Sequence, residues 1–127
     1  MSLDTIRLSQ KAKDRLIVLK RRTGITQWNI LCRWALCRSL AEKNPPPDHE
    51  IKTDSNIEIA WSTFGGEYAG IYLVLLKSRC IEDEIESTEE ILQKQLLAHI
   101  HRGVNYLFTE ITKGEVVQLL YSPNRKL

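Results

Sequence analysis

Positively charged side chains crowd the first part of the chain, where they could bind phosphate groups. Seven Lys and Arg residues lie from Arg7 to Arg22, with Asp14 as the one acid among them. Residues 1–43 carry ten basic and three acidic side chains, a net charge of +7, whereas residues 44–127 carry a net charge of −5. This asymmetry favours a polyanion such as DNA as the partner, with an acidic protein surface as the alternative. The predicted DNA contacts are Arg7, Lys11, Lys13, Arg15, Lys20, Arg21, Arg22 and Thr26.

Histidines could hold a metal ion. His99 and His101 are two residues apart, but on a helix their side chains diverge by about 200°, which opposes binding of one ion by both. His49 is isolated near the prolines. We therefore expect His99 and His101 to lie on a helix surface, and we expect no metal ion or other cofactor.

Cysteines could supply a nucleophilic thiol. Cys32 and Cys37 lie within one apolar stretch, and Cys80 follows another. A thiol in such surroundings is usually inert packing, and no glycine-flanked turn surrounds any of the three. We expect reduced, buried thiols, no catalytic residues and no enzymatic activity. A thiol-dependent hydrolase or sulphur carrier is the alternative, and it requires a reactive cysteine.

A short strand and a helix position the basic residues. Residues 5–9 alternate between polar and apolar, which is the period of a half-buried strand. Ser9 can cap a helix that runs to Thr23, and Gly24 can end it. At 100° per residue, the apolar face of this helix is formed by Ala12, Leu16 and Leu19. One basic flank then holds Lys11, Arg15 and Arg22, and a second flank, roughly opposite, holds Lys13 and Lys20.

A second helix is predicted over residues 27–42, with Thr26 as its cap candidate. Its apolar side chains spread almost all round the helical wheel, so most of its surface must be covered. Either the C-terminal half of the chain or a second subunit can provide this cover. Three prolines after Asn44 then favour an extended connection over residues 44–54.

The C-terminal half is predicted to be mainly helical. Residues 57–63 alternate like a strand and are followed by a turn at Gly65-Gly66. The apolar run that follows, residues 69–76, predicts a buried helix, with a strand as the alternative. A capping box of Ser87 and Glu90 opens a helix over residues 88–106, and we expect the end of the chain to be a frayed tail.

The predicted fold is therefore a single domain of residues 1–127 that is mainly α with short β. Residues 1–43 resemble a ribbon-helix-helix unit, residues 44–54 form the connection, and residues 55–127 form a mainly helical remainder. In ribbon-helix-helix proteins, strands from two subunits pair and enter the DNA major groove. Here their outward side chains would be Thr5, Arg7 and Ser9, while the start of the second helix near Thr26 would face a phosphate. This interpretation implies a homo-oligomer, a dimer or a tetramer; the alternative is a helical hairpin whose basic face is merely solvated.

Secretion and membrane insertion are not predicted. The first ten residues lack a basic segment followed by an apolar one. The longest strongly apolar run, residues 69–76, is far shorter than the ~20 residues that span a bilayer. We expect a cytoplasmic protein without a membrane partner.

Four stretches of the chain resemble the small E component of the bacterial Dnd DNA phosphorothioation (DNA sulphur modification) systems. They are "IRLSQKAKDRLIVLKRRTGI", "WNILCRWALCRSL", "FGGEYAGIYLVLLK" and "AHIHRGVNYL", in the same order. The resemblance implies an accessory subunit, without catalytic residues, that works with the other components of this modification machinery. The machinery as a whole is related to restriction-modification systems. It allows only the basic N-terminal positions to be assigned as DNA contacts.

We therefore predict a protein that binds double-stranded DNA, nicked or distorted DNA included, mainly through phosphate contacts during sulphur modification. Two alternatives stay open. One is a ribbon-helix-helix transcriptional repressor that recognises an operator through Thr5, Arg7 and Ser9. The other is a scaffold of the modification complex that touches only protein partners.

Overall fold

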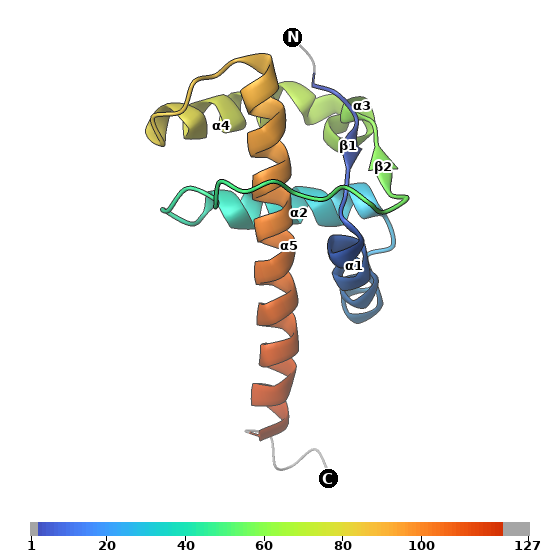
Figure 1. Cartoon of the computed structure of the whole chain (residues 1–127). Coiled ribbons are helices and arrows are strands. Elements are labelled where there is room, and N and C mark those ends of the chain that lie inside the picture. The colour runs from blue at the N-terminus through green and yellow to red at the C-terminus, as the bar shows by residue number, and fades with distance from the viewer. Residues whose placement is uncertain (1–2, 121–127) are drawn as a thin grey trace.

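The computed structural model describes residues 3–120, with side chains described to residue 114 (Figure 1). It is mainly helical with short β, as predicted, and its two short strands form one small antiparallel sheet. The frayed tail predicted for the end of the chain falls partly on residues 121–127, which lie outside the described part. In chain order the elements are β1 (Ile6–Arg7), α1 (Gln10–Thr23), α2 (Trp28–Leu40), β2 (Glu58–Ile59), α3 (Trp61–Gly65), the 3₁₀ turn η1 (Gly66–Tyr68), α4 (Ala69–Glu82) and α5 (Glu89–Leu120).

Helix α5 is the central helix, against which α1, α2 and α4 all pack. It stands across α2 and beside α1, and its C-terminal part extends past the other elements (Figure 1). Its core face is formed by Leu92, Leu96, Ile100 and Val104. The predicted helix over residues 88–106 is confirmed, but it continues to Leu120. The capping residue is Thr88 rather than Ser87, because the Thr88 hydroxyl accepts the N–H of Ile91.

Strand β1 and helix α1 follow the local sequence signals closely. Ile6 and Leu8 are fully buried, so the predicted alternation is confirmed. The Ser9 hydroxyl accepts the N–H of Ala12 at 3.0 Å and caps α1. At the other end, Gly24 has φ 78°, a left-handed conformation that suits glycine, and its N–H bonds to the Lys20 carbonyl. The buried face of α1 consists of Ala12, Leu16 and Leu19, as predicted.

The ribbon-helix-helix unit is not confirmed. β1 pairs antiparallel with β2 of the same chain, Ile6 opposite Ile59 and Arg7 opposite Glu58. In the predicted unit the strand would pair with a second subunit instead. The strand predicted over residues 57–63 is short because Trp61 already begins α3.

Helix α2 is one turn shorter than predicted. It begins at Trp28, with Gln27 in the capping position and no side-chain hydrogen bond there, so Thr26 is not the cap. The same chain covers most of its apolar surface, since α5, α3 and α1 all pack against it. Trp34 is the exception, with 58% of its surface exposed.

Helix α4 confirms a helix for the apolar run, but not a buried one. Ile71, Val74 and Ile81 are 58%, 62% and 72% exposed, whereas Leu76 and Cys80 on the other side are buried. The exposed residues form a stripe that we call the α4 apolar face; it consists of Tyr68, Ile71, Val74, Leu75 and Ile81. An exposed apolar surface of this kind is typical of a contact with another molecule, and the sequence pattern does not distinguish such a contact from burial within the same chain.

Candidate nucleic-acid interface

Helix α1 holds most of the predicted DNA contacts, and the structure separates its two basic flanks. Arg15, on the first flank, lies against α5, where its guanidinium donates to the Asn105 side-chain oxygen. The same guanidinium lies 5.2 Å from the centre of the Phe108 ring. Lys11, on the same flank, is exposed. Arg15 is thus held in place between two residues of α5.

The second flank, that of Lys13 and Lys20, borders β2 and the start of α2. The Lys13 ammonium donates to the Asn56 side-chain oxygen at 2.6 Å. The Lys20 ammonium lies 4.4 Å from the centre of the Trp28 ring. Beside them is an open depression of about 380 Å³ lined by Lys13, Trp28, Asn56, Ile57 and Glu58. We call it the Trp28 depression.

Arg21 and Arg22 occupy the last turn of α1 together with Lys20 and are exposed. Positive side chains at this end of a helix are favourable in any protein, because they oppose the partial negative charge of the last carbonyl groups. Their position therefore suits phosphate binding but does not require it. Thr26 is exposed in the turn between α1 and α2.

Residues of the predicted groove-reading strand have partners within the chain. Arg7 forms an ion pair with Glu58 at 2.8 Å, with about half of each side chain exposed. The Ser9 hydroxyl caps α1, and the Ser9 N–H donates to Nε2 of His101 at 3.1 Å. Of the three outward residues, Ser9 is thus committed to the fold.

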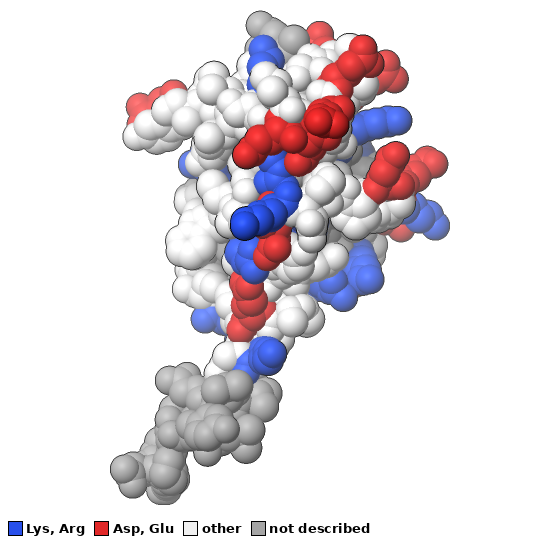
Figure 2. Space-filling view, turned by 90° about the vertical axis from the view of Figure 1, so that its left-hand side faces the viewer, with Lys and Arg blue, Asp and Glu red and all other residues white. Residues whose placement is uncertain are grey.

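Charge is unevenly distributed over the molecule. On the face shown in Figure 2, viewed from the side opposite α1, acidic side chains gather at the upper end. Below them, acidic and basic side chains alternate. Arg38 and Glu110 form an ion pair at 2.6 Å, and this contact lowers the pKa of Glu110. This face therefore presents no continuous positive surface for DNA.

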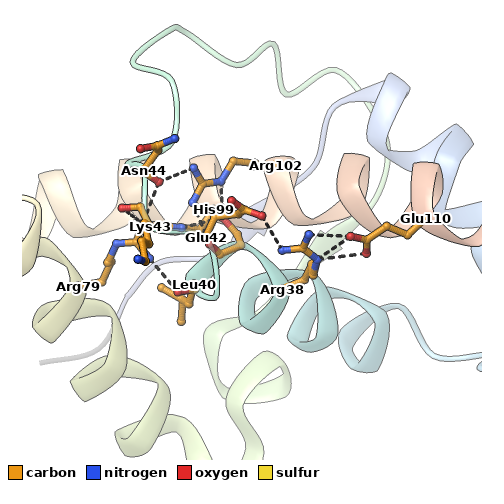
Figure 3. Close-up of polar contacts among 10 residues, drawn as sticks. Arg38, Leu40, Glu42, Lys43, Asn44, Arg79, His99, Arg102 and Glu110 are labelled. Atoms are coloured by element: carbon orange, nitrogen blue, oxygen red, sulfur yellow. Dashed lines mark hydrogen bonds and ion pairs between the residues drawn. The ribbon is translucent and has the colours of Figure 1, made fainter.

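Two buried arginines at the end of α2 were not predicted (Figure 3). The Arg102 guanidinium donates to the Ser39 hydroxyl and carbonyl, both at 2.8 Å, and to the Asn44 carbonyl at 2.6 Å. Arg79 donates to the carbonyls of Leu40 and Asn44 and forms an ion pair with Asp83. The last carbonyls of a helix have no partner within the helix. Arg79 and Arg102 thus cap α2 and anchor the start of the connection that follows it.

His99 is fully buried beside these arginines, so the prediction of a surface histidine is wrong for it. Its Nδ1 lies 2.8 Å from the Ser39 hydroxyl. The same hydroxyl also accepts from Arg102, so it links the imidazole to the guanidinium. Burial, and then the charge of Arg102, lower the pKa of His99 to about 4. His99 is therefore neutral at pH 7.

Stability should fall in mild acid because of His99. Its pKa is 6.5 when exposed and about 4 in the folded protein, so the unfolded chain takes up the proton first. The contribution is complete above pH 6.5 and is lost as the pH falls toward 4. We expect the free energy of unfolding to drop by about 2 kcal/mol between pH 7 and pH 5, measured by urea unfolding. His99→Gln should show a clearly smaller drop; an equal drop would assign it to other groups, such as half-buried His101.

The cysteines and histidines form no reactive or metal-binding cluster in the described residues. Cys32 and Cys80 are buried as predicted, but Cys37 is exposed. Burial raises the pKa of the Cys32 thiol to about 12 and raises that of Cys80, and partial desolvation raises that of Cys37 although the residue is exposed; in each case the thiolate is disfavoured. Among residues 3–120 no group of three or more His, Cys, Asp and Glu could hold a metal ion, and none of the helices there is long and apolar enough to cross a membrane.

Comparisons with known proteins point to one family. A family model described as "DNA sulphur modification protein DndE" matches residues 5–113. The chain is similar to the crystal structure of DndE from Escherichia coli B7A, involved in DNA phosphorothioation modification, with 28% identity and a TM-score of 0.71 over 84% of this chain and 98% of that chain. A crystal structure of a DndE mutant involved in DNA phosphorothioation shares the fold, with 22% identity and a TM-score of 0.63 over 84% and 99%. A comparison with curated proteins gives no match.

Proposed function

The chain belongs to the DndE family of DNA sulphur modification proteins, and from this premise we propose that it is a DNA-binding accessory subunit of DNA phosphorothioation. The observation that carries the proposal is the concentration of positive charge on α1. Six basic side chains project from this one helix, and Arg7 precedes it on β1. The subunit works in the cytoplasm with the other components of the modification machinery.

Contacts to phosphate groups dominate the proposed binding. Long Lys and Arg side chains bind phosphate without reading sequence, whereas base recognition needs polar groups aimed into a groove. Ser9 caps α1 and Arg7 is paired with Glu58, so two of the three groove-reading candidates have other partners. This disfavours the alternative of a sequence-specific repressor. Thr26 lies in the turn between the two helices, next to the N–H groups at the start of α2, and contributes a further phosphate contact.

DNA binding should therefore depend steeply on salt. If six to eight positive charges engage phosphates, the log–log slope of affinity against salt concentration should be roughly −5 to −7. Fluorescence anisotropy with one duplex from 50 to 200 mM salt measures it. Arg21→Ala should reduce the slope by about one, while Lys94→Ala on α5, far from α1 in sequence and at the acidic end of the molecule, should leave it unchanged. A flat response would leave the protein-only scaffold as the better explanation.

Nicked or bent duplexes are the proposed preferred form. Chemistry at a backbone phosphate is easier on a strand that is already distorted, and an intact duplex resists bending. The same anisotropy assay, with an intact and a nicked duplex of one sequence, tests this preference. Equal affinity for the intact and the nicked duplex would rule out this preference and would leave the proposal of DNA binding intact.

A catalytic role is not part of the proposal. The raised pKa values of the three cysteine thiols disfavour thiolate nucleophiles, which argues against a thiol-dependent activity. The chemistry of sulphur transfer is therefore left to the other components.

Self-association is the proposed use of the α4 apolar face. Exposed apolar stripes of this kind are uncommon on monomeric proteins and mark contact surfaces. A dimer or tetramer would also multiply the positive surfaces that one DNA molecule meets. Light scattering of the purified protein distinguishes a monomer, a dimer and a tetramer.

A further inference from the structure

The Trp28 depression contains chemistry that phosphate binding does not use. An aromatic ring, an ammonium group, a side-chain amide and a carboxylate surround one open space of about 380 Å³. Phosphate binding has no need of an aromatic ring. An aromatic face next to polar hydrogen-bonding groups is instead the combination that binds flat, polar ring systems.

The ring of Trp28 is already contacted by a positive charge. The Lys20 ammonium lies 4.4 Å from the ring centre, within the range of a cation–π contact. Lysine is a flexible side chain whose ammonium can turn toward a phosphate without moving the backbone. Lys20 is not among the residues that line the depression, so it can contact a phosphate beside a base that is stacked on Trp28.

Asn56 supplies the edge of the depression. Its side-chain oxygen accepts from Lys13, which fixes the orientation of the amide and directs its N–H groups elsewhere. An amide held in this way can donate to the acceptor atoms on the edge of a base. Glu58, on the same wall, is held by its ion pair with Arg7.

We propose that the Trp28 depression binds an unstacked base of a DNA strand, with the base stacked on Trp28 and its edge against Asn56, while Lys13 and Lys20 contact the adjacent phosphates. The inference rests on the proposed function and makes it more specific. It also assigns the second flank of α1, that of Lys13 and Lys20, to the distorted part of the DNA. Arg15 on the first flank is less suited to contact such a phosphate, because Asn105 and Phe108 both hold its guanidinium.

Three duplexes of one sequence test the proposal by fluorescence anisotropy: an intact duplex, one with a single bulged adenine, and one with an abasic residue at the bulge. The two bulged duplexes have the bulge at the same position and differ in the presence of the base. We expect the protein to bind the bulged adenine about tenfold more tightly than the abasic bulge, which corresponds to one stacked base. Trp28→Leu should abolish this difference and change affinity for the abasic bulge by less than about twofold.

Trp34→Leu is the matched control, because Trp34 also lies on α2 but is exposed and does not line the depression. It should retain the tenfold preference. Trp28 is half-buried and packs against the core, so thermal unfolding of each variant is measured first. Trp28→Phe, which keeps a smaller aromatic ring, should retain part of the preference. In the unmodified protein, the bulged adenine should also quench tryptophan fluorescence more than the abasic bulge does.

The outcomes separate the two proposals. Equal affinity of the unmodified protein for both bulged duplexes overturns base binding and leaves DNA binding intact. A preference that survives in Trp28→Leu, or that is lost equally in Trp34→Leu, overturns the assignment to this depression. If the unmodified protein binds none of the three duplexes, the proposed function fails together with the inference.

Discussion

Gly103→Ala should destabilise the protein by about 3 kcal/mol or more, measured as the free energy of urea unfolding at fixed protein concentration. Gly103 lies where α5 crosses α2, and the two backbones are in contact there. A Cβ atom at this position would lie 2.7 Å from the Ala35 Cα and closer still to its carbonyl carbon and oxygen. No rotamer change can relieve a clash with backbone atoms, so the helices would have to separate and loosen the core packing around Leu36 and Ile100.

Gly114→Ala is the matched control on the same helix. A Cβ atom at Gly114 meets nothing within 4 Å. Because alanine has the higher helix propensity, this variant should be neutral or stabilised by up to about 1 kcal/mol. Equal losses from both substitutions would mean that the cost lies in the helix itself and not in the crossing.

Arg102→Met should lower the free energy of unfolding by about 3 kcal/mol. Methionine keeps most of the length and volume of the side chain but has no N–H donor. The Ser39 hydroxyl and carbonyl, both buried, and the Asn44 carbonyl would each lose a charged donor at once. The Ser39 carbonyl keeps the N–H of Glu42 and the Asn44 carbonyl keeps Arg79, so the expected loss is that of three hydrogen bonds from a charged donor. Urea unfolding at pH 7 measures it.

Arg7→Met is the control that shows how much of the loss in Arg102→Met is due to the burial of Arg102. Arg7 also has a carboxylate partner, Glu58, but both side chains are about half exposed. Exposed ion pairs contribute at most about 1 kcal/mol, so this variant should unfold close to the unmodified protein. If Arg102→Met behaved the same way, other groups would have to satisfy the end of α2.

Short-range signals in the sequence were sufficient for the N-terminal helix. Ser9 and Gly24 delimit α1 because capping and the left-handed turn depend on one or two residues that are neighbours in sequence. The same reasoning misplaced the start of α2, since the Thr26 hydroxyl gives only a small preference that packing of Trp28 can outweigh. The end of α5 was missed for a related reason: Leu107 and Ile111 pack against the core and support helix beyond Tyr106.

Contacts between distant residues could not be predicted from the pattern. Pairing of β1 with β2 joins segments some fifty residues apart. The local sequence of residues 5–9 does not indicate which segment pairs with the strand. The burial of Arg102 and His99 depends on Ser39, which lies sixty or more residues away. The basic residues of the candidate interface were predicted from charge alone, but Trp28 and Asn56 were missed. Their relation to Lys13 and Lys20 exists only after the chain has folded.

Attachment of the basic segment to the last helix has a consequence for the order of synthesis. The N–H of Ser9 bonds to His101, 92 residues later, and Arg15 contacts Asn105 and Phe108. A nascent chain therefore carries its full positive charge long before the residues that fix the spacing of that charge have been made. A chain that terminates early would present unfolded positive charge, which attracts nucleic acid without the geometry to position it. Completion of α5 is thus the step that converts a charged segment into a defined surface.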